Sequence, residues 1–111
     1  MVIEPKTKAE YDKHLADAKG PVIVDFVQHD CSMCDPASLD ALAKDCSEVS
    51  KATIMRVEIS EGFGSELADV FKVEGTPTTM MAESVDKFTP TEAVEVDPGS
   101  KAVRRKLKCA R

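Results

Sequence analysis

Long apolar stretches are missing from this sequence. No run approaches the 18 or more uninterrupted apolar residues that a membrane span needs. The first residues, Met1 to Lys6, also lack the basic start and apolar run of a secretory signal peptide. These absences predict a protein with no membrane partner that works in the cytoplasm. With 111 residues and 42% hydrophobic content, the chain can bury one compact core, so we expect a single domain over residues 1–111.

An excess of positive charge is missing too. The chain has 15 Lys and Arg residues against 20 Asp and Glu residues, which gives a net charge of −5. A nucleic-acid surface would need a concentrated positive field, so we expect no nucleic-acid partner. Acidic residues are absent after position 100, where six basic residues gather: Lys101, Arg104, Arg105, Lys106, Lys108 and Arg111. This cluster is either the solvated end of a helix, with cations facing the negative end of the dipole, or a docking site for an acidic partner.

Tryptophan is absent, and so are internal repeats and low-complexity segments. Cysteine, in contrast, occurs four times, and Cys31 and Cys34 are separated by only two residues. Cys46 falls on the apolar face of a predicted helix, so we expect a small buried hydrophobic residue there. Cys109 is expected to be exposed, where it could be glutathionylated or pair with another molecule.

The spacing of apolar residues predicts alternating helices and strands. Thr7-Lys8-Ala9-Glu10 has the spacing of a capping box, and apolar residues at helical intervals follow it. Residues 22–27 are a β-branched run without alternation, which is typical of a central strand covered on both faces. A helix follows the close cysteine pair, and residues 53–59 form a second strand. The apolar face of this helix contains Leu39, Leu42, Ala43, Cys46 and Val49.

The second half of the chain has a less regular pattern. Gly62 and Gly64 predict a loose connection before a short helix that ends near Phe71. The elements predicted after it are a strand at residues 78–81, a hairpin of residues 85–88 and 93–96, and a helix from Ser100.

The close cysteine pair carries the chemistry. It lies between a strand and a helix, and two intervening residues at a helix start let both sulfurs reach bonding distance. The amides and dipole of the helix start would stabilise a thiolate on Cys31. We therefore assign Cys31 as the nucleophile that forms a mixed disulfide, and Cys34 as the more buried thiol that displaces the product. A bare pair of this spacing could equally be half of a zinc site.

From about Val22 to Met81, the sequence resembles the thioredoxin family. The family's strand with a buried aspartate six residues before its first cysteine matches Val24-Asp25-Phe26, and its Gly-x-Pro-Thr segment matches Gly75-Thr76-Pro77-Thr78. The resemblance implies an α/β fold with a central mixed sheet flanked by helices on both faces. It also implies that the Thr76–Pro77 bond is cis and faces the disulfide, and that the Thr76 backbone pairs with an extended substrate.

The resemblance gives Asp25 a catalytic role as the buried proton acceptor that helps deprotonate Cys34. Burial among Val and Phe neighbours should raise the pKa of Asp25 toward the working range. A hydrogen-bonded structural acid is the alternative. Arg56 stands where many members of the family have a lysine, and its permanent charge would favour ionised Asp25 unless its side chain points outward.

The motif itself departs from the family pattern. The usual Trp-Cys-Gly-Pro-Cys is replaced by Asp30-Cys31-Ser32-Met33-Cys34. Like charge on Asp30 should raise the pKa of Cys31, favour the disulfide and make the couple more reducing. Met33 offers a soft apolar contact to substrates. His29 could tune the pair electrostatically or be a simple exposed residue, and Pro36 is expected in the first helical turn.

Together these features predict a monomeric thiol–disulfide oxidoreductase that reduces disulfide-containing client proteins. Electrons would come from thioredoxin reductase or another dithiol donor, and neither a cofactor nor a metal is required. The alternative is a non-catalytic interaction module in which the two cysteines form a static disulfide or bind a soft metal with outside ligands. An oxidase or isomerase of secreted proteins is a third reading.

Overall fold

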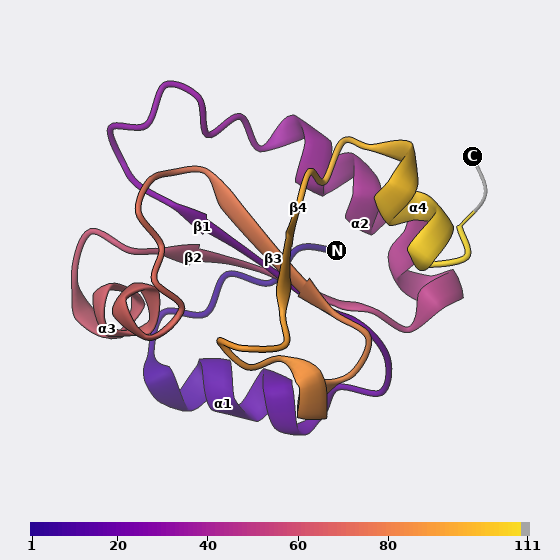
Figure 1. Ribbon diagram of the computed structural model, residues 1–111, viewed down its shortest axis with the longest axis horizontal. Coiled ribbons are helices and arrows are strands. Elements are labelled where there is room, and N and C mark those ends of the chain that lie inside the picture. The colour runs from indigo at the N-terminus through magenta and orange to yellow at the C-terminus, as the bar shows by residue number, and fades with distance from the viewer. Residues whose placement is uncertain (110–111) are drawn as a thin grey trace.

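The computed structural model describes residues 1–109, which form a four-stranded mixed sheet with the strand order β2-β1-β3-β4 (Figure 1). The central strand β1 pairs in parallel with β2 and antiparallel with β3, and β4 is antiparallel to β3. The strands are β1 (Val22–Val27), β2 (Thr53–Glu58), β3 (Thr78–Ala82) and β4 (Val94–Val96). The helices are α1 (Lys8–Ala16), α2 (Ala37–Ser50), α3 (Gly62–Val70), α4 (Lys101–Lys106) and the 3₁₀ helix η1 (Val85–Lys87).

Helices cover both faces of the sheet, which confirms the predicted fold class. Helices α2 and α4 lie on one side and α1 and α3 on the other (Figure 1). Because side chains alternate along a strand, Ile23 of β1 packs on the α2 side, while Val24 and Phe26 pack on the α1 side. The residues of β1 from Val22 to Phe26 are all buried, as the unbroken apolar run predicts. Among residues 1–109, no helix is long and apolar enough to cross a membrane.

Hydroxyl side chains cap two of the predicted helix starts, and at Thr7 the cap itself was predicted. The hydroxyl of Thr7 accepts a hydrogen bond of 3.1 Å from the Glu10 amide, and α1 begins at the next residue, Lys8. Ser100 does the same for Val103 at the start of α4. In α1 the carboxylate of Glu10 accepts from the Lys6 amide at 2.7 Å, so the reciprocal half of a capping box is shifted by one residue.

Two predictions in the second half of the chain are wrong. Residues 85–88 do not form a hairpin strand: they contain η1, and β4 pairs with β3 instead. The two glycines do not loosen a connection, because both lie inside α3. A Cβ atom at Gly64 would collide with the carbonyl oxygen of Glu58, so a glycine here lets α3 approach β2 closely.

Val49 departs from the predicted apolar face of α2. Leu39, Leu42, Ala43 and Cys46 are buried as expected, but Val49 is 68% exposed. It belongs to the last turn of the helix, which borders an open hollow of about 820 Å³ instead of the sheet. The spacing of apolar residues therefore continues to the end of α2, whereas the part of the helix that packs on the core ends before Val49.

The chain turns back at the end of α4. The Lys108 amide donates to the Arg105 carbonyl and the Cys109 amide to the Arg104 carbonyl, with Lys108 at a φ of 57°. This is the Schellman pattern of helix termination. It directs Cys109 toward α2, where Cys109 is only 4% exposed and forms a disulfide with Cys46. The expected exposure of Cys109 and its pairing with another molecule are therefore wrong. Cys46 is buried as expected, but as half of a disulfide and not as a simple hydrophobic residue.

An extended segment at the N-terminus joins the sheet. Ile3 forms an isolated parallel bridge with Met55. The Ile3 amide donates to the Ile54 carbonyl, and the Arg56 amide donates to the Ile3 carbonyl, both at 2.9 Å. The apolar run before Glu4 and Pro5, Met1-Val2-Ile3, is too short to show a periodic pattern, so the sequence did not predict this contact.

Candidate functional site

Cys31 and Cys34 form a disulfide in the loop between β1 and α2. Their Cα atoms are 5.3 Å apart, and both residues are partly buried. Two successive turns shape the loop: the Cys31 amide donates to the Gln28 carbonyl at 3.3 Å and the Cys34 amide to the Cys31 carbonyl at 3.2 Å. The predicted pair is thus brought together as an oxidised unit.

The disulfide precedes α2 instead of opening it. Helix α2 begins at Ala37 with Pro36 as its N-cap, so Pro36 lies just before the first turn in which it was predicted. The Ala37 amide donates to the carboxylate of Asp35 at 3.0 Å, because a short acidic side chain reaches the amide two residues further on. This helix-start amide therefore binds Asp35 and not a thiolate of Cys31, a role for Asp35 that the sequence analysis missed.

Asp25 is buried inside the sheet, with an exposed fraction of 5%. Its carboxylate accepts a hydrogen bond of 3.0 Å from the Thr79 hydroxyl on the neighbouring strand β3. Burial raises the pKa of Asp25 above its ordinary value, and the Thr79 hydrogen bond and the positive charge of Arg56 offset part of this rise. The rise of the Asp25 pKa and its cause, burial of the carboxyl group, are those that the sequence predicted.

Arg56 does not form an ion pair with Asp25, although the two residues are register partners on β2 and β1. Its guanidinium pairs with the Asp40 carboxylate at 2.9 Å and more loosely with Glu4 at 3.8 Å. It also donates to the Pro36 carbonyl at 3.4 Å, and its side chain is only 14% exposed. Arg56 therefore lies over the first turn of α2 and acts on Asp25 through its charge.

The Thr76–Pro77 peptide bond is cis, as the resemblance implies. The Thr76 hydroxyl donates a hydrogen bond of 2.9 Å to the side chain of Gln28. Because the Gln28 carbonyl also accepts from the Cys31 amide, Gln28 connects the proline loop to the cysteine loop. Gln28 was not among the predicted site residues, because its only sequence signal is its place between β1 and Cys31.

The remaining side chains predicted around the pair lie at the surface. Met33 is 75% exposed, and Asp30 and His29 are exposed too. The imidazole of His29 lies 3.5 Å from the Glu58 carboxylate. Burial tends to raise the pKa of Glu58, but hydrogen bonds from Ser60 and the nearby His29 outweigh it, so this pKa is lowered. The side chain of His29 therefore points toward Glu58 at the end of β2.

A hollow of about 440 Å³ includes the proline loop. Gly75, Thr76 and Pro77 line it together with Phe71 and Val73 from the segment that follows α3. Within residues 1–109, no group of three or more His, Cys, Asp or Glu side chains is placed to hold a metal ion. The arrangement as a whole is a half-buried disulfide, an adjoining loop with a cis proline that lines a hollow, and a buried carboxylate.

The Thioredoxin family model matches residues 2–102, whereas no curated protein sequence matches the chain. Among solved structures, oxidised thioredoxin O2 from Arabidopsis thaliana is similar, with 21% identity and a TM-score of 0.66 over 96% of this chain and 93% of that one. Malassezia sympodialis thioredoxin gives 18% identity and a TM-score of 0.71 over 100% and 92% of the two chains. Oxidised thioredoxin from Plasmodium falciparum gives 19% and 0.65 over 97% and 96%.

Proposed function

Because the chain belongs to the thioredoxin family, we propose that its thiol–disulfide oxidoreductase activity reduces disulfide bonds of client proteins through Cys31 and Cys34. The single observation that carries this proposal is the Cys31–Cys34 disulfide, which is only partly buried and adjoins the Thr76–Pro77 loop. This disulfide is the product state of a reductase cycle.

The cycle has two exchange steps. The Cys31 thiolate attacks one sulfur of the client disulfide, which forms a mixed disulfide and releases the other client sulfur as a thiolate that takes up a proton. Cys34 then loses its proton, and its thiolate attacks the Cys31 sulfur. This breaks the mixed disulfide, frees the second client thiol and restores the Cys31–Cys34 bond. We propose Asp25 as the group that accepts the Cys34 proton, a role for which burial has shifted its pKa upward.

The acidic side chains around the pair favour reduction of clients over their oxidation. Asp30 is adjacent to Cys31, and Asp35 occupies a helix-start amide that would otherwise stabilise an anion. Both effects disfavour a thiolate in the reduced protein and so favour the disulfide form. A couple whose disulfide is favoured is a better electron donor, whereas strong oxidants are those whose reduced form is stabilised.

The hollow beside Pro77 suits an extended client segment. In this proposal the client backbone pairs with the backbone of Thr76, and its side chains contact the apolar surface of Phe71 and Val73. Met33 lies next to the disulfide with its flexible thioether exposed, so it adds an adaptable contact for client chains of different sequence.

After each cycle the Cys31–Cys34 disulfide must be reduced again by an electron donor. We expect thioredoxin reductase or another dithiol donor to return two electrons to the Cys31–Cys34 disulfide in the cytoplasm, with the protein acting as a monomer. Three measurements would test these proposals. Size-exclusion chromatography with light scattering tests the monomer, and cell fractionation tests the location in the cytoplasm. A coupled assay with a reductase and NADPH tests the electron donor.

The first test is the reduction potential of Cys31 and Cys34 in dithiol buffers, with Cys46 and Cys109 replaced by serine and the redox state read by alkylation and mass. A reversible two-electron couple at or below about −270 mV supports a reductase. A value of about −120 to −180 mV would indicate an oxidant or isomerase and contradict the electrostatic argument. No reversible couple would favour the non-catalytic module.

The second test is turnover of a disulfide-containing protein with dithiothreitol as the electron source. Cys31→Ser should abolish the acceleration, and Cys34→Ser should accumulate a mixed disulfide between Cys31 and the client. If Asp25 acts as the base, Asp25→Asn should slow the resolving step about 100-fold or more. Unchanged turnover in Cys31→Ser would exclude the assigned nucleophile.

A further inference from the structure

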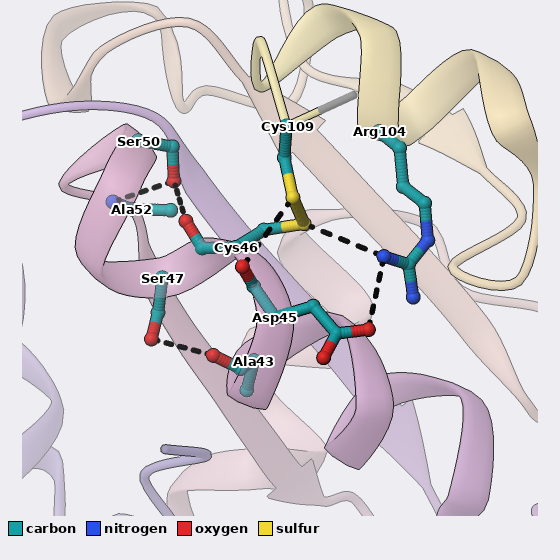
Figure 2. Close-up of a disulfide and its surroundings, with 8 residues drawn as sticks. All are labelled: Ala43, Asp45, Cys46, Ser47, Ser50, Ala52, Arg104 and Cys109. Carbon is teal, nitrogen blue, oxygen red and sulfur yellow. Dashed lines mark hydrogen bonds and ion pairs between the residues drawn. A yellow bond between two sulfur atoms is a disulfide. The ribbon is translucent and has the colours of Figure 1, made fainter. Parts of the chain in front are cut away.

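A second disulfide joins α2 to the segment after α4. Cys46 lies in the middle of α2 and is fully buried, and Cys109 follows the Schellman turn with an exposed fraction of 4% (Figure 2). Their Cα atoms are 5.4 Å apart, and 63 residues separate them in the chain. None of the residues of the cycle described above touches this bond through a hydrogen bond or ion pair.

Polar groups at this bond are arranged to suit its reduced form. The guanidinium of Arg104 lies 3.7 Å from the Cys46 sulfur, and the Cys109 sulfur lies 3.4 Å from the Asp45 carbonyl oxygen (Figure 2). A disulfide sulfur has no proton to donate. After reduction, however, the Cys109 thiol can donate to that carbonyl, and Arg104 can stabilise negative charge on Cys46.

Arg104 also forms an ion pair with Asp45. Its guanidinium pairs with the Asp45 carboxylate at 3.1 Å, and its side chain is 18% exposed. Asp45 therefore limits the effect of Arg104 on a Cys46 thiolate but also keeps the guanidinium against the sulfur (Figure 2).

The segment fastened by this bond has little stability of its own. Helix α4 has six residues, fewer than an isolated helix needs in water. It is attached through Val103 and Leu107, which pack into the apolar cluster of α2, and through the Arg104–Asp45 ion pair. Loss of the disulfide would remove the covalent cross-link between Cys46 of α2 and Cys109, which follows α4.

We propose that Cys46 and Cys109 are a second dithiol–disulfide couple, with Arg104 facing the Cys46 sulfur, that fastens α4 to α2 when oxidised and loosens it when reduced. A dithiol reductant supplies two electrons and two protons. Its first thiolate attacks Cys109, the S–S bond breaks, and Cys46 leaves as a thiolate beside Arg104, in equilibrium with the thiol that forms when it takes up a proton. The second thiol of the reductant then displaces the Cys109 thiol and forms the reductant's own disulfide. Because both sulfurs are buried, attack requires the segment with Cys109 to move outward.

The test uses the full chain with Cys31→Ser and Cys34→Ser, so that only the second pair exchanges electrons. The protein is equilibrated with oxidised and reduced dithiothreitol under native conditions, and the redox state is read by alkylation and mass. A reversible two-electron titration is expected. A bond that stays closed at the most reducing ratio, or a pair that stays reduced at the most oxidising one, would overturn the proposal.

Arg104→Gln tests the assigned electrostatic contact, and Arg105→Gln is the matched control because it removes the same charge from an exposed neighbour. Arg104→Gln should shift the equilibrium toward the disulfide by about threefold, since the reduced Cys46 loses its cationic partner. An equal response of the two variants would contradict the contact.

Amide hydrogen exchange tests the fastening. On reduction of the second pair, exchange at residues 103–109 should accelerate ~10-fold or more while α1 keeps its protection. The variant Cys109→Ser should show the same faster exchange without reductant. Unchanged exchange in both cases would show that α4 does not depend on the bond.

Discussion

Thr79 donates a hydrogen bond of 3.0 Å to the carboxylate of Asp25, and the two residues face each other as register partners on β3 and β1. They are the two buried polar residues among residues 1–109. One hydroxyl does not replace the water that an ionised carboxylate loses on burial, which is why the pKa of Asp25 stays raised. The folded protein thus retains a proton on Asp25 more readily than the unfolded chain does.

This relationship predicts how stability depends on pH. The free energy of unfolding should fall as the pH rises from about the ordinary value of 3.8 through the raised folded pKa, because ionisation costs more in the folded state. Asp25→Asn removes this step, so the variant should be more stable than the parent at pH 7 and equally stable below the ordinary pKa. Urea unfolding at several pH values would measure it, with exposed Asp86→Asn as control. A variant less stable at pH 7 would contradict the prediction.

Arg56 should influence the pKa of Asp25 through its charge, without direct contact. Its positive charge lowers the pKa of Asp25, so Arg56→Gln should move the ionisation of Asp25 to higher pH. The lost pairing with Asp40 should cost up to about 1 kcal/mol. Carboxyl-carbon NMR of Asp25 across a pH series would show the shift, and exposed Lys44→Gln would control for net charge. A shift of equal size in both variants would rule out a specific effect.

Asp30 should make the Cys31–Cys34 couple more reducing, but only slightly. It is exposed, so solvent screens its repulsion of a Cys31 thiolate. Asp30→Asn should raise the reduction potential by less than about 30 mV, which corresponds to about 1.4 kcal/mol. Glu92→Gln makes the same charge change outside the cysteine loop and should leave the potential in place. A fall in potential in Asp30→Asn would reverse the assigned sign.

Gly64 should tolerate no side chain. A Cβ atom there meets the Glu58 carbonyl oxygen, a backbone atom that cannot turn away, so Gly64→Ala should destabilise the fold by about 2 kcal/mol or more. At Gly75 a Cβ atom has nothing within 4 Å, so Gly75→Ala should change stability by at most about 0.5 kcal/mol. Thermal unfolding followed by circular dichroism would compare the two, and equal melting temperatures would refute the packing argument.

Elements with strong local patterns were predicted well. The cap at Thr7, the helix start at Ser100 and the strand β1 were each predicted from a pattern that lies within a few residues of the chain. Residues 85–88 were wrongly predicted as a hairpin strand, because their apolar side chains pack against the core and their backbone does not pair with a strand. Phe88 lies 5.0 Å from Phe71 between ring centres, and that contact is tertiary.

The pairing of Cys31 with Cys34, the burial of Asp25 and the cis bond before Pro77 were predicted. The contacts that connect the cysteine loop to the proline loop and to α2 were not. Asp35 and Gln28 make contacts that depend on the path of the chain between β1 and α2. The burial of Cys109 also had no sequence signal, because Lys108 takes the left-handed position where a glycine would mark the turn.

The bridge between Ile3 and Met55 occupies backbone groups of β2 on the side that β1 does not use. At the opposite edge of the sheet, β4 is three residues long and contains the exposed charge of Glu95. Intermolecular β-aggregation starts from long unpaired strand edges, and charge and short length both hinder it. We therefore expect the native sheet to be a poor template for fibril growth, even in concentrated solution.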